Sequence, residues 1–266
     1  MTNAHSRYTQ CSQSGHAKAL NIMFIVASTG RCGTMALCGA LDAYSDHRMQ
    51  HEQEPLLLAE SYYAWAGKSR LSSDYLRRMR NWHLTQHAKY GEAVRCAALI
   101  TDIARVARQC RVLFLFRKPL QYLHSAWGRG VMRKGDIYDR YRILPPEAAV
   151  RSPVDQILFH FAAVNSLLVE AARRLDPQGL AIEVGDLDQD IERMTTFLGV
   201  RITNRQAVSE QLATRLNAGP RVPWTAQPLP EPSADAMTAA ELAYRNFKSL
   251  ASNGNCPSIC SSGIER

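Results

Sequence analysis

A short segment with two glycines, one arginine and two threonines carries the most distinctive chemistry in this sequence. It reads Thr29-Gly-Arg-Cys-Gly-Thr34 and follows an apolar run over residues 22–28. A glycine-bearing turn between a strand and a helix leaves backbone N–H groups unpaired at the helix N-terminus, where the helix dipole also attracts negative charge. Arg31 adds a fixed positive charge, and Thr34 adds a hydroxyl donor. The segment therefore predicts a site for a phosphate or a phosphate-like group.

A second basic segment follows another apolar run. Residues 112–116 are all apolar, as expected of a strand that is buried on both faces of a parallel sheet. Arg117 stands at the carboxyl end of this strand, Pro119 opens the next helix, and Ser125 lies two turns into that helix. Ligands of such sheets lie beyond the carboxyl ends of the strands, so we expect Arg117 to lie near the first anion segment.

Candidate proton acceptors gather after a third, shorter strand, which we predict near residues 48–51. The cluster reads His51-Glu-Gln-Glu54. Histidine has a suitable pKa for a base at neutral pH, and burial could raise the pKa of a carboxyl group. We rank Glu52 first, His51 second and Glu54 third as the base, with a solvated polar loop as the alternative. Because a strand alternates its side chains, we expect that His51 and Glu52 do not face the same ligand.

The two anion segments resemble the donor-binding loops of sulfotransferases that use 3′-phosphoadenosine-5′-phosphosulfate (PAPS). The first resembles the loop that holds the sulfate-bearing 5′ end of the donor. The second matches a family pattern of Arg-Asp-Pro with a serine eight residues after the arginine, although Lys118 replaces the aspartate. Residues 180–187 are similar to a late strand and turn of the family, with Gly185 in place of a glutamate. The resemblance covers roughly residues 20–200.

This resemblance implies a PAPS-dependent sulfotransferase that moves a sulfuryl group in line to a hydroxyl or amine, without a metal. Arg31 would stabilise the negative charge that develops on the bridging oxygen, and the catalytic set would be Glu52, His51 and Arg31. Arg117 and Ser125 would grip the 3′-phosphate. The implied donor-binding residues are Thr29, Gly30, Arg31, Cys32, Gly33, Thr34, Met35, Arg117 and Ser125.

Two other functions stay open. A phosphoryl-transfer, kinase-like or other nucleotide-binding protein could use the same strand, loop and helix, although the lysine of the standard nucleotide-binding loop is missing. A non-catalytic relic of the sulfotransferase fold could retain the nucleotide site, and the departures at Lys118 and Gly185 keep this alternative open.

The elements that must position these residues alternate between strands and helices. This alternation predicts an α/β fold, with a doubly wound parallel sheet flanked by helices and a P-loop-like sulfotransferase architecture. We expect a loose N-terminal arm over residues 1–19, one domain over 20–251 and a flexible tail over 252–266. The expected helices are 34–44, most of 56–89, 93–109, one beginning at 153, 190–198 and 234–250; the expected strands are 22–28, 48–51, 111–117 and one near 180–187.

Composition bounds the remaining possibilities. The chain has 266 residues, 46% hydrophobic content and a formal net charge of +8. This charge suits an anionic ligand, whereas no basic helix or zinc spacing supports nucleic-acid binding. The seven cysteines, without a secretory signal or a membrane-spanning run, favour a cytoplasmic protein with reduced thiols. Cys32 could be a reactive thiol, but a small residue that fits a tight turn is the favoured interpretation.

The sequence does not identify the acceptor. Residues 56–90 and 126–151 are expected to determine it, and we interpret the second segment as an insert over the active site. A small molecule, glycan, lipid or peptide hydroxyl would all fit. The oligomeric state is also left open.

Overall fold

The computed structural model describes most of the central part of the chain. The described residues are 23–52, 56–68, 90–106, 110–132, 135, 140–176, 178–214 and 228–252. The expected N-terminal arm lies outside these ranges, as does the expected C-terminal tail apart from Ser252, which is the last residue of a helix.

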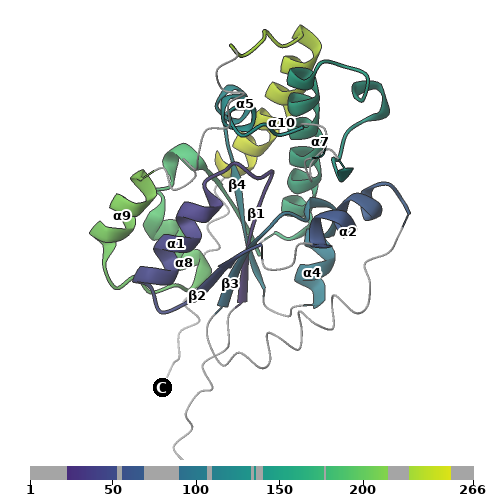
Figure 1. The fold of residues 1–266 in the computed structure, drawn as a ribbon. Helices are drawn as coiled ribbons and strands as arrows, with labels where there is room; N and C mark the ends of the chain where they lie inside the picture. Colours follow the sequence, from purple (N-terminus) through teal and green to yellow (C-terminus); the bar gives the residue numbers. More distant parts are fainter. Residues whose placement is uncertain are drawn as a thin grey trace, which may run out of the picture.

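Within the described residues, five parallel strands form one sheet at the centre of the molecule (Figure 1). Their order across the sheet is β2-β3-β1-β4-β5, and each neighbouring pair is parallel. This arrangement confirms the predicted α/β fold with a parallel sheet. The strands are β1 (Met23–Ser28), β2 (Arg48–His51), β3 (Tyr90–Val94), β4 (Arg111–Phe116) and β5 (Gly179–Glu183).

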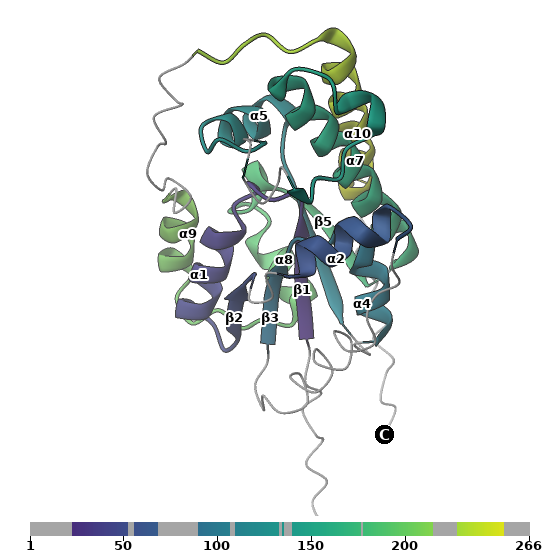
Figure 2. The ribbon, with the colours of Figure 1, turned by 45° about the vertical axis from the view of Figure 1, so that its right-hand side comes forward.

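Helices cover both faces of the sheet (Figure 2). One face carries α1 (Thr34–Tyr44), α8 (Ile191–Leu198) and α9 (Arg205–Ala213). The other carries α2 (Leu56–Trp65), α4 (Ile100–Val106), α5 (Pro119–Trp127), α7 (Pro153–Arg174) and α10 (Ala234–Ser252). Three short 3₁₀ turns complete the described elements: η1 (Ala97–Leu99), η2 (Pro146–Ala148) and η3 (Val184–Asp186).

The apolar runs of the central strands feed two separate cores. In β1, Ile25 points into the core on the α7 side, whereas Phe24 and Val26 point into the core on the α1 side. All three side chains are fully buried. Alternate side chains of a strand face opposite sides of the sheet, so a strand covered on both sides must be apolar throughout. This requirement explains the run that predicted the strand.

The strand β3 differs from the sequence prediction, which placed helices on both sides of residue 90. Its sequence lacks an apolar run because it contains Gly91 and the buried Glu92. A Cβ atom at Gly91 would overlap the ring of Phe24 and would lie 2.5 Å from the sulfur of Met49. Close packing therefore requires glycine at this position. Because a glycine and a glutamate interrupt the apolar pattern, the hydrophobic periodicity of the sequence does not indicate a strand here.

Most other predicted elements are confirmed. The helix expected over 93–109 is replaced by the end of β3, then η1 and α4. The helix α9 lies in a stretch that shows no clear periodicity in its sequence. Of the segment expected to be helical over 56–89, α2 ends at Trp65, and residues 69–89 lie outside the described part.

Chain connections leave β1 and β4 toward opposite faces of the sheet. After β1 the chain enters α1 on one face, whereas after β4 it enters α5 and then α7 on the other. Such a reversal between neighbouring strands opens a crevice at their carboxyl ends, where open α/β sheets bind ligands. The two predicted anion segments both come directly after these strands.

The helix α7 is the longest described helix, and its buried face is not wholly apolar. Ser152 caps it by accepting a hydrogen bond from the backbone N–H of Asp155 at 3.2 Å. His160 is buried, and its Nδ1 lies 3.0 Å from the carbonyl oxygen of Ile143. Burial lowers the pKa of His160 from its ordinary 6.5 to about 4, against the opposing effect of this hydrogen bond. Within the described ranges, no helix is long and apolar enough to cross a membrane.

His160 should make the stability of the protein depend on pH. Because its folded-state pKa is depressed, the unfolded chain binds the proton first as pH falls from about 6.5 toward 4, and the free energy of unfolding should drop by about 1.4 kcal/mol per pH unit in this window. His160→Gln keeps a donor for Ile143 but does not titrate, so its urea-unfolding curves should lose that component. Equal pH dependence in both proteins would contradict this assignment.

Candidate active site

The loop between β1 and α1 has an unusual backbone. Gly30, Arg31 and Gly33 all have positive φ angles, of 81°, 54° and 71°. Glycine adopts such angles readily, whereas a left-handed arginine costs on the order of 1 kcal/mol or more. The backbone N–H of Gly30 donates to Oγ of Ser28 at 3.1 Å, which closes the start of the loop. The surrounding contacts must therefore stabilise the left-handed backbone conformation of Arg31, which is unfavourable for an isolated residue.

The underside of this loop is buried. Thr29 is 3% exposed, and its hydroxyl donates to Oδ1 of Asn165 on α7 at 2.8 Å. Cys32 is fully buried, and burial raises the pKa of its thiol to about 12, against the opposing effects of Arg117 and of hydrogen bonding with Thr29. The thiol is thus protonated at neutral pH, which agrees with the favoured interpretation of Cys32 as a small packing residue.

Hydrogen bonds from two arginine side chains join the two predicted anion segments. Nη1 of Arg117 donates to the carbonyl oxygen of Arg31 at 3.0 Å. The Arg31 guanidinium in turn donates to Oγ of Ser125, from Nη2 at 3.1 Å and from Nε at 3.3 Å. The structure therefore brings Arg31, Arg117 and Ser125 together at the carboxyl ends of β1 and β4. It also directs the Arg31 guanidinium toward Ser125.

The helices α1 and α5 both begin at this edge without side-chain caps. Gly33 and Lys118 are their N-cap residues; neither makes a side-chain cap bond, and neither helix has an acidic residue in its first turn. By contrast, Ser152 caps α7 and Asn204 caps α9. Uncapped N–H groups keep their hydrogen-bonding capacity and their share of the helix dipole for an anion. The two helix ends nearest the arginines are thus suited to negative groups.

Lys118 finds an acidic partner on the neighbouring strand. Its Nζ lies 4.0 Å from Oε1 of Glu183 at the end of β5. The buried Glu183 carboxylate also accepts a hydrogen bond at 2.9 Å from the hydroxyl of Tyr244 on α10. Gly185, which departs from the family pattern, lies in the η3 turn two residues later. An ion pair therefore joins the N-cap residue of α5 to the end of β5.

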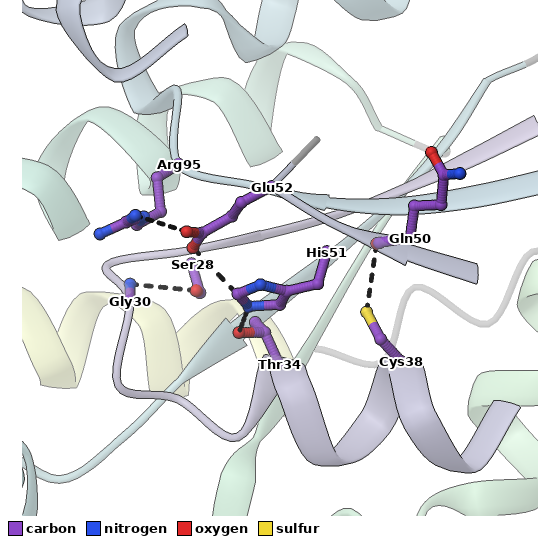
Figure 3. A network of polar contacts seen from close by, with 8 residues as sticks. All are labelled: Ser28, Gly30, Thr34, Cys38, Gln50, His51, Glu52 and Arg95. Atoms are coloured by element: carbon purple, nitrogen blue, oxygen red, sulfur yellow. Dashed lines mark hydrogen bonds and ion pairs between the residues drawn. The ribbon is translucent and has the colours of Figure 1, made fainter. Parts of the chain in front are cut away.

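A second polar network lies beside the loop (Figure 3). Nε2 of His51 is 3.0 Å from Oγ1 of Thr34, the first residue of α1, and 3.6 Å from Oε1 of Glu52. The other carboxylate oxygen of Glu52 accepts a hydrogen bond from Arg95, which comes directly after β3. The network connects the ends of β2 and β3 to the anion loop.

The side chains of His51 and Glu52 lie close together, although strand alternation would direct them to opposite sides. The strand β2 ends at His51, and Glu52 has a left-handed φ of 53°. Strand alternation therefore stops between the two residues, and their side chains converge. The backbone N–H of Glu52 donates to the carbonyl oxygen of Ala93 at 2.9 Å, which holds this bend against β3.

His51 is neutral at ordinary pH. Its pKa lies below 6.5, chiefly because burial disfavours the charged ring. The Glu52 carboxylate raises the pKa of His51 and Arg95 lowers it. A neutral ring retains one nitrogen that can accept a proton.

The remaining predicted site residues are Met35 and Glu54. Met35 lies in the first turn of α1 with 48% of its surface exposed, and Glu54 is not described. Sequence reasoning missed Arg95 and Asn165. Arg95 comes after the strand that was not recognised, and no signal in its sequence distinguishes it. Asn165 lies in α7 at helical spacing from the apolar Phe161 and Leu168, so the period of this helix could have placed it on the buried face.

Comparisons with known proteins add only a distant likeness of fold. No protein-family model and no curated protein matches the sequence. One similar solved structure is retinol dehydratase in complex with androsterone and the inactive cofactor PAP, at 13% identity and a TM-score of 0.39, covering 85% of this chain and 80% of that chain. Another is mouse sulfotransferase SULT7A1 complexed with PAP, at 12% identity and a TM-score of 0.33, covering 85% and 92%. At these identities and TM-scores the likeness identifies no activity.

The buried position of Cys32 gives a direct chemical test of the loop. Because its pKa is about 12, the thiol should resist iodoacetamide at pH 8 in the folded protein and react only after unfolding. Mass spectrometry of peptides before and after denaturation measures this difference. Rapid labelling of Cys32 in the folded protein would contradict the buried arrangement of the loop.

Proposed function

We propose that this protein is a PAPS-dependent sulfotransferase that moves a sulfuryl group from PAPS to a hydroxyl or amine of an acceptor. The observation that carries this proposal is the convergence of Arg31, Arg117 and Ser125 at the carboxyl ends of β1 and β4. A donor with phosphate groups at both ends of one ribose needs adjacent anion sites of this kind. The proposed metal-free reaction needs only such cations and donors, together with a base.

The two uncapped helix ends supply the proposed donor sites. Backbone N–H groups of residues 31–34, at the start of α1, would hold the 5′-phosphate and sulfate oxygens, since that of Gly30 already donates to Ser28. Arg117, Ser125 and the α5 N-terminus would hold the 3′-phosphate. Arg31 spans both sites, since its backbone belongs to the first and its guanidinium lies on Ser125 of the second. To stabilise the negative charge that develops on the leaving 5′-phosphate, the Arg31 guanidinium would have to turn from Ser125 toward the α1 N-terminus during the reaction.

The polar network beside Thr34 supplies the proposed base. His51 contacts the residue at which the loop enters α1, so a proton acceptor there lies next to the proposed 5′ end of the donor. Glu52 is paired with Arg95, whereas His51 is neutral. We therefore propose that His51 accepts the proton of the acceptor and that Glu52 orients the ring, which reverses the order favoured by the sequence. A cytoplasmic location and an unidentified small-molecule, glycan, lipid or peptide acceptor complete the proposal.

Nucleotide preference tests the proposed donor site. In titration calorimetry, the protein should bind 3′,5′-adenosine bisphosphate, which is the donor without its sulfuryl group, more tightly than it binds ATP with Mg²⁺. Loss of one charged hydrogen-bond donor costs about 1.5–3 kcal/mol, so Arg117→Ala should weaken bisphosphate binding about 10- to 100-fold. Arg174→Ala, near the carboxyl end of α7, removes an exposed arginine and should bind as the wild type does.

Two results would contradict the donor assignment. Preference for ATP would favour the phosphoryl-transfer alternative, and equal losses in the Arg117 and Arg174 variants would show that charge alone matters. Binding of the bisphosphate without transfer of a sulfuryl group to any class of acceptor would favour the alternative of a non-catalytic protein that retains the nucleotide site.

The pH dependence of turnover tests the base. With labelled donor and an active acceptor, kcat/KM should rise with pH through an inflection below 6.5, because the pKa of His51 is lowered. His51→Gln should lose this limb of the pH dependence, and its kcat/KM should fall about 10²- to 10⁴-fold. Glu52→Gln should move the limb to lower pH, since the carboxylate raises the pKa of His51, and Arg95→Met should move it to higher pH. A limb that persists in His51→Gln would contradict the assignment.

A further inference from the structure

Asn165 is an amide buried in the middle of α7, below the anion loop. The residue is fully buried, and its Oδ1 accepts the hydrogen bond from Thr29 at 2.8 Å. Its Nδ2 is also buried and makes no hydrogen bond with any described residue. The neighbouring buried residues of the same helix include the apolar Phe161, Val164 and Leu168. Asn165 is therefore a polar group in an apolar stretch, with one specific partner.

Stability alone does not account for this amide. Leaving a buried donor without a partner costs at least as much free energy as one ordinary hydrogen bond contributes. A leucine of similar size at position 165 would avoid the cost and join the surrounding core. The hydrogen bond that Asn165 accepts comes from Thr29, so we expect Asn165 to affect the conformation of the loop that begins at Thr29.

Thr29 stands where the strand ends and the strained loop begins. It lies immediately before Gly30 and Arg31, both of which have left-handed backbones. Its hydroxyl also takes part in hydrogen bonding with the buried Cys32 thiol, three residues further along the loop. Thr29 thus connects the loop to Asn165 from below. Arg117 holds the carbonyl of Arg31 independently.

We infer that Asn165 is a positioning residue, which fixes Thr29 and so aims the backbone N–H groups of the loop at the 5′-phosphate of the donor. The inference rests on the proposed function, because it assigns the loop to that end of the nucleotide. Asn165 is fully buried and does not touch the ligand. It acts on one end of the nucleotide, and Arg117 and Ser125 serve the other end.

Three nucleotides separate this role from a general loosening of the protein. The probes are 3′,5′-adenosine bisphosphate, adenosine 5′-phosphate and adenosine 3′-phosphate, each measured by calorimetry. Asn165→Leu and Thr29→Val should each weaken the two 5′-phosphorylated ligands about tenfold and leave adenosine 3′-phosphate unchanged. The double variant should bind no worse than either single variant, since both remove the same bond. Thr29→Ser keeps the hydroxyl and should weaken the two 5′-phosphorylated ligands less than Thr29→Val does.

Thr195→Val is the matched control. It removes a buried threonine hydroxyl that donates to the carbonyl oxygen of Ile191 within α8, on the face of the sheet opposite α7. This change should leave all three affinities unchanged. Equal weakening of all three nucleotides in Asn165→Leu and Thr29→Val, or unchanged binding in both, would overturn the inference. Thr29→Val carries the same test if Asn165→Leu does not fold. A wild-type protein that binds none of the nucleotides would instead overturn the proposed function.

Discussion

The hydrogen bond from the Arg117 guanidinium to the carbonyl oxygen of Arg31 joins the ends of two neighbouring strands. Arg117 comes directly after β4, and Arg31 lies in the loop after β1. The bond fixes a left-handed arginine that a free chain would disfavour. It also orients the Arg31 peptide, with its carbonyl held by Arg117. The candidate anion site depends on this one constraint, because both helix N-termini and both arginines meet there.

The helix α7 provides the rigid support behind the site. Its buried polar residues each hold a different loop: Asp155 accepts from the backbone N–H of Ser233, His160 contacts the carbonyl of Ile143, and Asn165 holds Thr29. Buried hydrogen bonds of this kind are strong in the low-dielectric interior and are costly to leave unmade. One helix can therefore set the positions of three segments that are distant in the sequence.

Sequence reasoning located the parts of the site that have local signatures. The loop after β1 and the arginine after β4 both come at the ends of apolar runs, and such runs predict buried parallel strands. The sequence did not predict β3, because the strand contains a glycine, required by the close approach of the Phe24 ring, and a glutamate that is buried. Arg95 was missed with that strand. The convergence of His51 and Glu52 depends on one left-handed backbone angle, which residue types alone do not specify.

The central claim is that one bisphosphorylated nucleotide spans the ends of β1 and β4. A crystal structure of the protein with 3′,5′-adenosine bisphosphate tests it most directly. We expect the 5′-phosphate on the backbone N–H groups of residues 31–34 and the 3′-phosphate on Arg117 and Ser125. A nucleotide bound at another edge of the sheet, or with its two phosphates exchanged, would contradict the claim.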